Sequence, residues 1–158
     1  MNDTNALTID PEMLTRLAKV STATIATQLY KRGYRRCYLN GVKPLHPGTA
    51  SFVAPAFTLR NIPMREDVDD MAILGDPEYP QRSTIGTTPS GYCPVNDACA
   101  NVTAGTIGDI LAERLRVQGV TAAVTDDAVR DSGDLEGIAY QFTAPLAQHQ
   151  PAFLIYTR

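Results

Sequence analysis

Two short motifs in the second half of the chain carry residue types that suit chemistry on a small acid. The first is Gly108-Asp109-Ile110-Leu111, near the start of a helix that we expect over Thr106 to Gln118. The first turn of a helix has backbone N–H groups without intrahelical partners, and its dipole attracts carboxylates and phosphates. Because Gly108 has no side chain, it leaves this end of the helix open. The motif therefore predicts an anion-binding site.

The same residues also allow a purely structural interpretation. Thr106 and Asp109 have the Ser/Thr-x-x-acid spacing of a capping box, in which two side chains bind the first backbone N–H groups of their own helix. On spacing alone, this interpretation is favoured over ligand binding.

The second motif is Arg130-Asp131, which follows the run Val120 to Thr125 by a few residues. This run is typical of a buried strand, and ligands of open α/β sheets gather at the carboxyl ends of strands. Arg binds a carboxylate through two parallel N–H bonds, and Asp is an oxygen ligand suited to Mg²⁺ or Mn²⁺. The alternative is a surface ion pair. Asp126 and Asp127 make this region more acidic, which favours either a cation or a solvated loop.

Motifs for other kinds of catalysis are absent from the sequence. There is no G-x-S-x-G elbow, no phosphate-binding loop of the G-x-x-x-x-G-K type and no G-x-G-x-x-G. The lysines Lys19, Lys31 and Lys43 are typical of helix surfaces and loops, so a Schiff-base mechanism lacks an obvious amine. His46 and His149 have no nucleophile nearby in sequence. If the protein cleaves or forms bonds beside a carbonyl, a metal is the expected electrophile.

Helices, loops and strands alternate along the chain, which favours an α/β sheet protein. No repeat or linker interrupts it, so we expect a single domain over residues 1–158. Residues 75–101 contain many Pro and Gly residues and are expected to be the least regular part. The other expected elements are helices from Asp10-Pro11, from Ser21 or Thr22, over Asp67 to Leu74 and from Ser132, and strands over Ser51 to Ile62, Val120 to Thr125 and Tyr140 to Thr143.

The composition is that of an ordinary globular protein, with 44% hydrophobic and 20% charged residues. A net charge of -3 argues against broad binding to nucleic acid or to an anionic membrane. No apolar run approaches the roughly 18 residues of a membrane span, and the N-terminus lacks signal-peptide features. Cys37, Cys93 and Cys99 are expected to be reduced thiols of a cytoplasmic protein rather than zinc ligands.

A local basic cluster stands out against this acidic balance. It comprises Lys31, Arg32, Arg35 and Arg36. The cluster follows an expected helix, where cations interact favourably with the negative end of the helix dipole, so a solvated helix end is the favoured interpretation.

Several collinear segments together resemble the RraA-like family, which contains 4-hydroxy-4-methyl-2-oxoglutarate aldolases and regulators of ribonuclease E activity. The resemblance spans roughly Val20 to Ile138. The segments Pro63 to Asp69 and Pro80 to Arg82 look like those of longer, sugar-acid-associated members. The main segments are Val20 to Leu29, Gly41 to Leu45, Ala54 to Arg60, Gly108 to Leu111 and Val124 to Asp131.

The resemblance implies a swivelling β/β/α sandwich that assembles as trimers or hexamers, with sites between subunits. It implies a class II, divalent-metal-dependent aldolase that releases pyruvate from a 4-hydroxy-2-oxo acid, with oxaloacetate decarboxylase activity. The expected cofactor is Mg²⁺, Mn²⁺ or another divalent cation. A protein-binding regulator of a ribonuclease and a dehydratase acting on a sugar-derived acid stay open as alternatives.

The resemblance also implies roles for individual residues. Gly108, Asp109, Ile110 and Leu111 would bind the pyruvate moiety through backbone N–H groups. Arg130 would bind its oxygens and stabilise the enolate, and Asp131 would hold Mg²⁺ largely through water. Asp109 would orient or deprotonate a water that serves as acid and base.

Three features depart from the family pattern. The family usually has Gly at the position of Asp127, and an unbroken apolar strand at Cys93-Pro94. Family members also continue for many residues beyond the region of Ala144, so the resemblance implies a fold shortened at its C-terminus.

Overall fold

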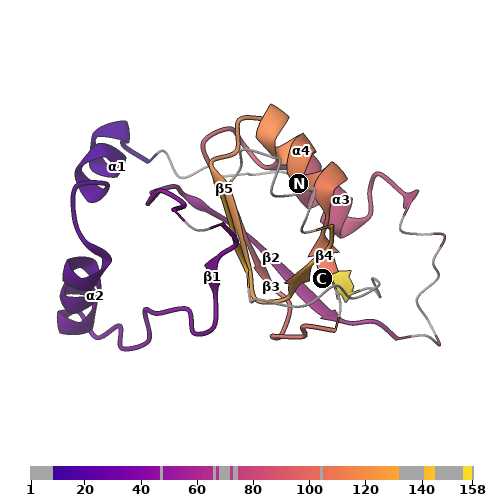
Figure 1. Ribbon diagram of the computed structural model, residues 1–158, viewed down its shortest axis with the longest axis horizontal. Coiled ribbons are helices and arrows are strands. Elements are labelled where there is room, and N and C mark those ends of the chain that lie inside the picture. Colours follow the sequence, from indigo (N-terminus) through magenta and orange to yellow (C-terminus); the bar gives the residue numbers. More distant parts are fainter. Residues whose placement is uncertain are drawn as a thin grey trace, which may run out of the picture.

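A computed structural model of the protein describes residues 9–46, 48–65, 67, 72, 75–103, 105–131, 141–144 and 155–157. Its centre is a six-stranded sheet in the order β1-β7-β5-β3-β2-β8. The four inner strands run parallel, and the two edge strands pair antiparallel (Figure 1). The strands are β1 (Lys43–Pro44), β2 (Ala56–Pro63), β3 (Cys93–Asp97), β5 (Ala122–Thr125), β7 (Gln141–Ala144) and β8 (Ile155–Thr157).

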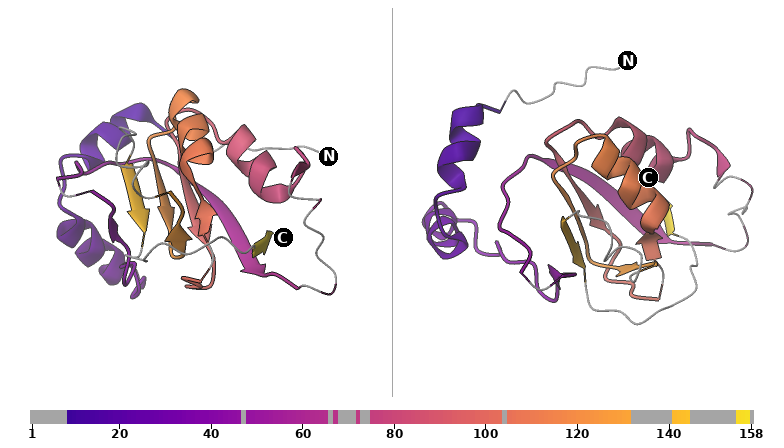
Figure 2. Two further views of the ribbon diagram at one scale, coloured as in Figure 1. Left: turned by 45° about the vertical axis from the view of Figure 1, so that its right-hand side comes forward. Right: turned by 45° about the horizontal axis from the view of Figure 1, so that its top comes forward.

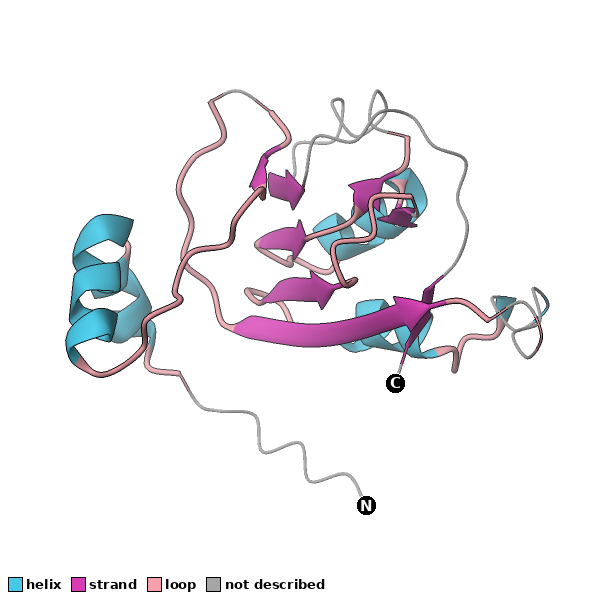
Figure 3. Ribbon diagram, turned by 90° about the horizontal axis from the view of Figure 1, so that it is seen from below, coloured by secondary structure: helices cyan, strands magenta, loops and turns pink. Residues whose placement is uncertain are grey.

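A second, two-stranded sheet consists of β4 (Gly105–Ile107) and β6 (Ala128–Val129), which pair in parallel. Helix α4 (Asp109–Val117) follows β4 directly, and α3 (Pro80–Thr87) precedes β3. Both helices lie on one face of the six-stranded sheet (Figure 3). This mixture of parallel strands and covering helices confirms the predicted α/β fold class.

The core lies between this pair of helices and the strands beneath them. Leu111 and Leu115 of α4 face the core, whereas Ile110 is 78% exposed. The predicted helix start at Thr106 was wrong: Thr106 and Ile107 belong to β4, and α4 begins at Asp109. The buried residues of the main core cluster are Ile85, Ile107, Ala112, Leu115, Val120, Ala123 and Val129.

We predict that Leu115→Ala lowers the free energy of unfolding by about 2–5 kcal/mol, because Leu115 is fully buried and its loss leaves a cavity. Val117 lies on the same helix but is 71% exposed, so Val117→Ala is the matched control and should change stability little. Urea unfolding of both variants measures the difference. Equal midpoints for the two would contradict the packing described for α4.

Both N-terminal helices begin where their capping residues predicted. In α1 (Pro11–Leu17), Asp10 accepts a hydrogen bond from the backbone N–H of Glu12 at 2.9 Å. In α2 (Thr22–Lys31), Ser21 accepts one from the N–H of Thr24 at 3.2 Å. Both helices stand apart from the sheet in Figure 1 and in the right view of Figure 2, and they bury no residue.

Residues 75–101, predicted to be the least regular part, nevertheless contain the short elements α3 and β3. Pro80 occupies the first turn of α3, where its missing N–H would have no partner. Pro94 lies near the start of β3, which pairs with β5 only from Val95 onward. The strand predicted from Ser51 begins at Ala56, just after Pro55.

Other predictions have mixed outcomes. The strand expected over Tyr140 to Thr143 corresponds to β7, whereas the helices expected over Asp67 to Leu74 and from Ser132 fall wholly or mostly outside the described residues. The three cysteines are free thiols, and burial raises the pKa of Cys93 to about 12. Within the described ranges, no helix is long and apolar enough to cross a membrane.

Candidate functional site

The parallel strands β4 and β6 bring the two motifs of the sequence together. Gly108 follows β4, Arg130 and Asp131 follow β6, and the Arg130 N–H donates to the carbonyl oxygen of Ile107 at 2.9 Å. We had expected Arg130 at the end of the run Val120 to Thr125. It lies instead at the end of β6. The reason is that the chain turns after β5 and begins a new strand at Ala128.

Glycines beneath Arg130 and Asp131 allow both side chains to approach the backbone closely. A Cβ at Gly108 would lie only 2.7 Å from Oδ2 of Asp131 and 3.5 Å from Nη2 of Arg130. A Cβ at Gly105 would lie 2.6 Å from Cγ of Arg130. Any side chain at Gly108 or Gly105 would therefore displace the guanidinium or the carboxylate, so the glycines are part of the geometry.

The start of α4 differs from the predicted capping box. Gly108 is the N-cap residue and supplies no side-chain cap, while Thr106 is buried in β4. Asp109 is the first residue of the helix, and its Oδ1 accepts from the N–H of Ile110 at 2.7 Å. Leu111 packs partly against the core. The predicted ligand-binding segment Gly108 to Leu111 is thus a helix start, but one of its N–H groups is bound to Asp109.

Asp131 has a left-handed backbone with φ +56, and the residue is exposed. Asp adopts this conformation more readily than most residues, though at some energetic cost. Such strain is often found at functional sites. With the exposed Arg130 beside it, the end of β6 presents one carboxylate and one guanidinium over the start of α4.

The available donor atoms fit Mg²⁺ better than zinc. Mg²⁺ is commonly held by one or two carboxylates and keeps several waters, and the carboxylates of Asp131 and Asp109 are hard oxygen donors of that kind. Structural zinc needs four Cys, His or carboxylate ligands. Across the described part of the chain, no group of three His, Cys, Asp or Glu side chains could hold a metal ion.

The carboxylates of Asp126 and Asp127 accept hydrogen bonds from other groups of the protein instead of facing solvent in a loop. Asp126 accepts hydrogen bonds from the N–H groups of Ala98 at 2.6 Å and Ala100 at 2.8 Å. Cys99 and Ala100 in that turn have left-handed backbones with φ +58 and +53. Asp126 therefore stabilises a strained turn, and the solvated-loop interpretation was wrong for this residue.

Asp127 was expected in an acidic turn, but its carboxylate is buried. It is 0% exposed, its Oδ2 accepts from the N–H of Thr106 at 2.9 Å, and its Oδ1 accepts from the hydroxyl of Thr125. Loss of solvation raises its pKa to about 6, although these hydrogen bonds act in the opposite direction. Its backbone is not left-handed, so Asp127 is accommodated without backbone strain at a position where the resemblance implied a glycine.

A buried polar network connects Asp127 to the large sheet. Asn96 of β3 donates through Nδ2 to Oγ1 of Thr106 at 2.6 Å and to Oγ1 of Thr125 at 3.3 Å. Its Oδ1 accepts from Nδ2 of Asn61 in β2 at 2.5 Å. The network therefore joins strands β2, β3 and β5 to β4 at Thr106, directly after Gly105, over which Arg130 lies.

Comparison with known proteins gives a consistent match. A model of the RraA-like family, described as Aldolase/RraA, matches residues 22–151. The structure of RraAS2 from Streptomyces coelicolor, an unusual member of the RNase ES inhibitor RraA family, has 25% identity and a TM-score of 0.78. The RNA-processing inhibitor RraA from Thermus thermophilis has 22% identity and a TM-score of 0.56. No curated protein matches the chain.

Each structural match covers a larger share of this chain than of the matched protein. RraAS2 aligns with 95% of this chain over 71% of its length, and the Thermus protein with 80% over 70%. An uncharacterised protein from Pseudomonas syringae, at 21% identity and TM-score 0.73, aligns with 95% of this chain over 63% of its own.

Proposed function

Since this chain belongs to the RraA-like family, we propose that it is a divalent-metal-dependent lyase that releases pyruvate from a 4-hydroxy-2-oxo acid. The observation that carries this proposal is the meeting of Gly108, Arg130 and Asp131 at the ends of β4 and β6. The family includes both aldolases and inhibitors of ribonuclease E, so membership alone does not choose between them.

In the proposed reaction, the protein first binds the 2-oxo acid and then stabilises the negative charge that develops on its enolate. The N–H groups at the start of α4 and the guanidinium of Arg130 bind the oxygens of the 2-oxo acid. When the 4-hydroxyl group gives up its proton, the bond between C3 and C4 breaks, C4 becomes a carbonyl carbon, and the electron pair leaves negative charge on the enolate oxygen until C3 is protonated. Arg130 offsets this charge where it develops, which is the most effective place for a fixed cation.

Asp131 would supply the carboxylate oxygen for Mg²⁺ or Mn²⁺, with waters completing the coordination. When bound, the ion supplies Lewis-acid polarisation of the substrate carbonyl. Asp109 would also orient a water and accept or return its proton, which requires it to release the N–H of Ile110.

The test is pyruvate release from oxaloacetate and from a 4-hydroxy-2-oxo acid, with Mg²⁺ and with excess EDTA. We expect turnover with Mg²⁺ and a loss of at least about 100-fold with EDTA, because metal assistance supplies several kcal/mol. Buffer containing Mg²⁺ but no protein corrects for spontaneous decarboxylation of oxaloacetate. The same rate in EDTA would eliminate a metal-dependent lyase.

A regulator of a ribonuclease is the second candidate function. It is favoured by the similarity to two proteins. RraAS2 is described as a member of the RNase ES inhibitor RraA family, and the Thermus protein is described as an RNA-processing inhibitor. The acidic balance suits a basic protein segment better than RNA. Binding to a ribonuclease that persists in EDTA, together with no pyruvate release, would favour this function over the lyase.

A dehydratase acting on a sugar-derived acid is an alternative activity that would use the same enolate-stabilising groups. We also propose a cytoplasmic location and assembly as a homo-oligomer, a trimer or a hexamer, as members of this family are oligomers.

A further inference from the structure

The positive charge of this protein is concentrated in one part of the sequence. Residues 13–65 contain nine basic side chains and no acidic one, whereas residues 66–158 contain five basic and fourteen acidic side chains. The net charge of -3 is therefore the sum of one strongly positive segment and its negative flanks. A negative protein disfavours broad binding to polyanions, but a segment that is uniformly positive still attracts them locally.

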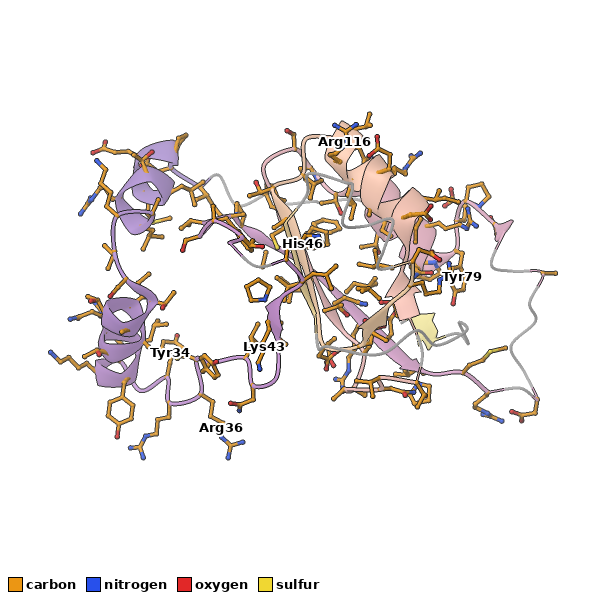
Figure 4. All side chains as sticks on the ribbon, in the orientation of Figure 1. Tyr34, Arg36, Lys43, His46, Tyr79 and Arg116 are labelled. Atoms are coloured by element: carbon orange, nitrogen blue, oxygen red, sulfur yellow. The ribbon has the colours of Figure 1, made fainter. Side chains whose placement is uncertain are left out.

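The densest part of this charge lies in residues 30–38, which we call the Tyr-Arg segment. Every fourth residue of it is a tyrosine, and four of the six residues between the tyrosines are basic. Tyr30, Tyr34 and Tyr38 are 61%, 64% and 79% exposed. Tyr34 and Arg36 lie on the stretch of chain after α2, well away from the sheet (Figure 4). Exposed aromatic rings and cations therefore alternate along one continuous stretch of chain.

A solvated helix end explains Lys31 and Arg32 but not the two arginines that follow. Arg32 is the C-cap residue of α2, and its Nη1 donates to the carbonyl oxygen of Gln28 at 2.9 Å and to its Oε1 at 3.3 Å. Arg35 and Arg36 lie beyond this cap, and among the described residues they form no ion pair. The helix dipole acts within the last turn, so it does not account for them.

The Tyr-Arg segment also places its cations beside its rings. The guanidinium carbon of Arg35 lies over the Tyr30 ring, 5.9 Å from the ring centre. Gly33 has φ +94, a left-handed conformation that turns the chain at the end of α2. After this turn, Tyr34, Arg35 and Arg36 line a shallow groove of about 640 Å³. The groove thus combines one aromatic ring with two guanidinium groups.

The tyrosines indicate which kind of anion suits this surface. Single-stranded RNA offers phosphates together with unpaired bases, and such bases stack on exposed aromatic rings and on arginine planes. A membrane-binding segment buries a broad apolar face, yet the Tyr-Arg segment contains no Leu, Ile, Val, Met, Phe or Trp. An acidic protein segment matches the charge but has no bases to stack on the tyrosines.

From these observations we infer that the Tyr-Arg segment binds single-stranded RNA. The arginines beyond α2 contact phosphates, and the three exposed tyrosines stack on unpaired bases. Because every base has a face that can stack, the binding has little sequence preference. The inference does not depend on the proposed lyase, because binding is measured without turnover.

The test is fluorescence anisotropy of the full chain with labelled oligouridine over a series of salt concentrations. We expect Tyr34→Ala/Tyr38→Ala to weaken binding at least about 10-fold without changing the salt dependence, because stacking carries no charge. Arg35→Gln/Arg36→Gln should lower the slope of log K against log salt by about 1.4, since each phosphate contact on a single strand contributes about 0.7.

The matched control is Arg114→Gln/Arg116→Gln, which removes the same charge from exposed positions on α4 and should bind RNA like the wild type. None of the substituted tyrosines or arginines of the Tyr-Arg segment is buried, so the fold should persist, and circular dichroism verifies it.

Four results would overturn the inference. Oligouridine that does not bind at low salt is the first, and wild-type affinity in the tyrosine variant is the second. The third is equally strong binding of duplex RNA, whose bases are stacked inside the helix. The last is equally strong binding to phosphatidylserine vesicles or to polyglutamate, which would assign the segment to a lipid surface or to an acidic protein.

Discussion

Asp131→Asn is expected to lower metal-dependent pyruvate release by about 100- to 1000-fold, the range seen when one stabilising group is removed from a reacting centre. Asp131 is the carboxylate that lies closest to Gly108, with Oδ2 only 2.7 Å from where a Cβ would be. Asn keeps the shape of the side chain but removes its charge, so it binds Mg²⁺ poorly. Arg130 keeps its position over Gly105 in this variant.

Asn is a better choice than Ala at this position because of the backbone. Asp131 has φ +56, which Asn tolerates well, whereas Ala would pay roughly 1–2 kcal/mol. Asp131→Ala is also expected to abolish activity, but part of its effect would come from strain. Asp67→Asn is the matched control, since Asp67 pairs with Arg65 on an exposed loop. Full activity in Asp131→Asn would show that the metal assignment is wrong.

The sequence could predict which residues meet in the candidate site but not how they are arranged. Helix-start chemistry singled out Gly108, and residue type singled out Arg130 and Asp131. That β6 exists at all was not predictable, because a two-residue strand has too few residues for any periodicity to show. The start of α4 was misplaced for a related reason: the Thr106–Asp109 spacing of a capping box occurs by chance, and pairing with β6 holds Thr106 in a strand instead.

Local capping rules worked where no tertiary contact competes with them. Asp10 and Ser21 cap their helices as expected, and those helices bury no residue. Tertiary contacts decided the opposite cases. Asp126 and Asp127 read as an acidic loop, yet each satisfies backbone N–H groups from strands or turns more than twenty residues away. No local pattern in one sequence contains that information.

The second large expected effect is a pH dependence of the free energy of unfolding, caused by the buried carboxyl group of Asp127. The folded-state pKa is about 6, raised by loss of solvation from the ordinary value of 3.8. Below about pH 4 the carboxyl is protonated in both states. As the pH rises the unfolded chain loses its proton first, so the group's contribution to stability is lost between about pH 4 and 6. At about 1.4 kcal/mol per pKa unit, the loss is about 3 kcal/mol.

Asp127→Asn should remove this pH dependence. A neutral amide resembles the protonated carboxyl: its oxygen can accept from the N–H of Thr106 and its nitrogen can donate to Thr125. We expect urea midpoints of wild type and variant to agree near pH 4, and the variant to be more stable above pH 6. The exposed carboxylates Asp67 and Glu113, whose pKa values are lowered by arginines, are common to both proteins and cancel in the difference. Parallel stability curves would contradict a raised pKa at Asp127.

Asp127→Ala separates the hydrogen bonds of Asp127 from its charge. At pH 4 the charge is absent from the wild type, so only the lost bonds matter. The N–H of Thr106 would then be buried without its partner, which costs about 1–3 kcal/mol. We therefore expect Asp127→Ala to be less stable than Asp127→Asn at every pH. Because Thr106 is next to Gly105, over which Arg130 lies, the same loss should loosen the position of the guanidinium. An ionised Asp127 thus lowers stability at neutral pH, while its hydrogen bonds hold β4 in the position that the candidate site requires.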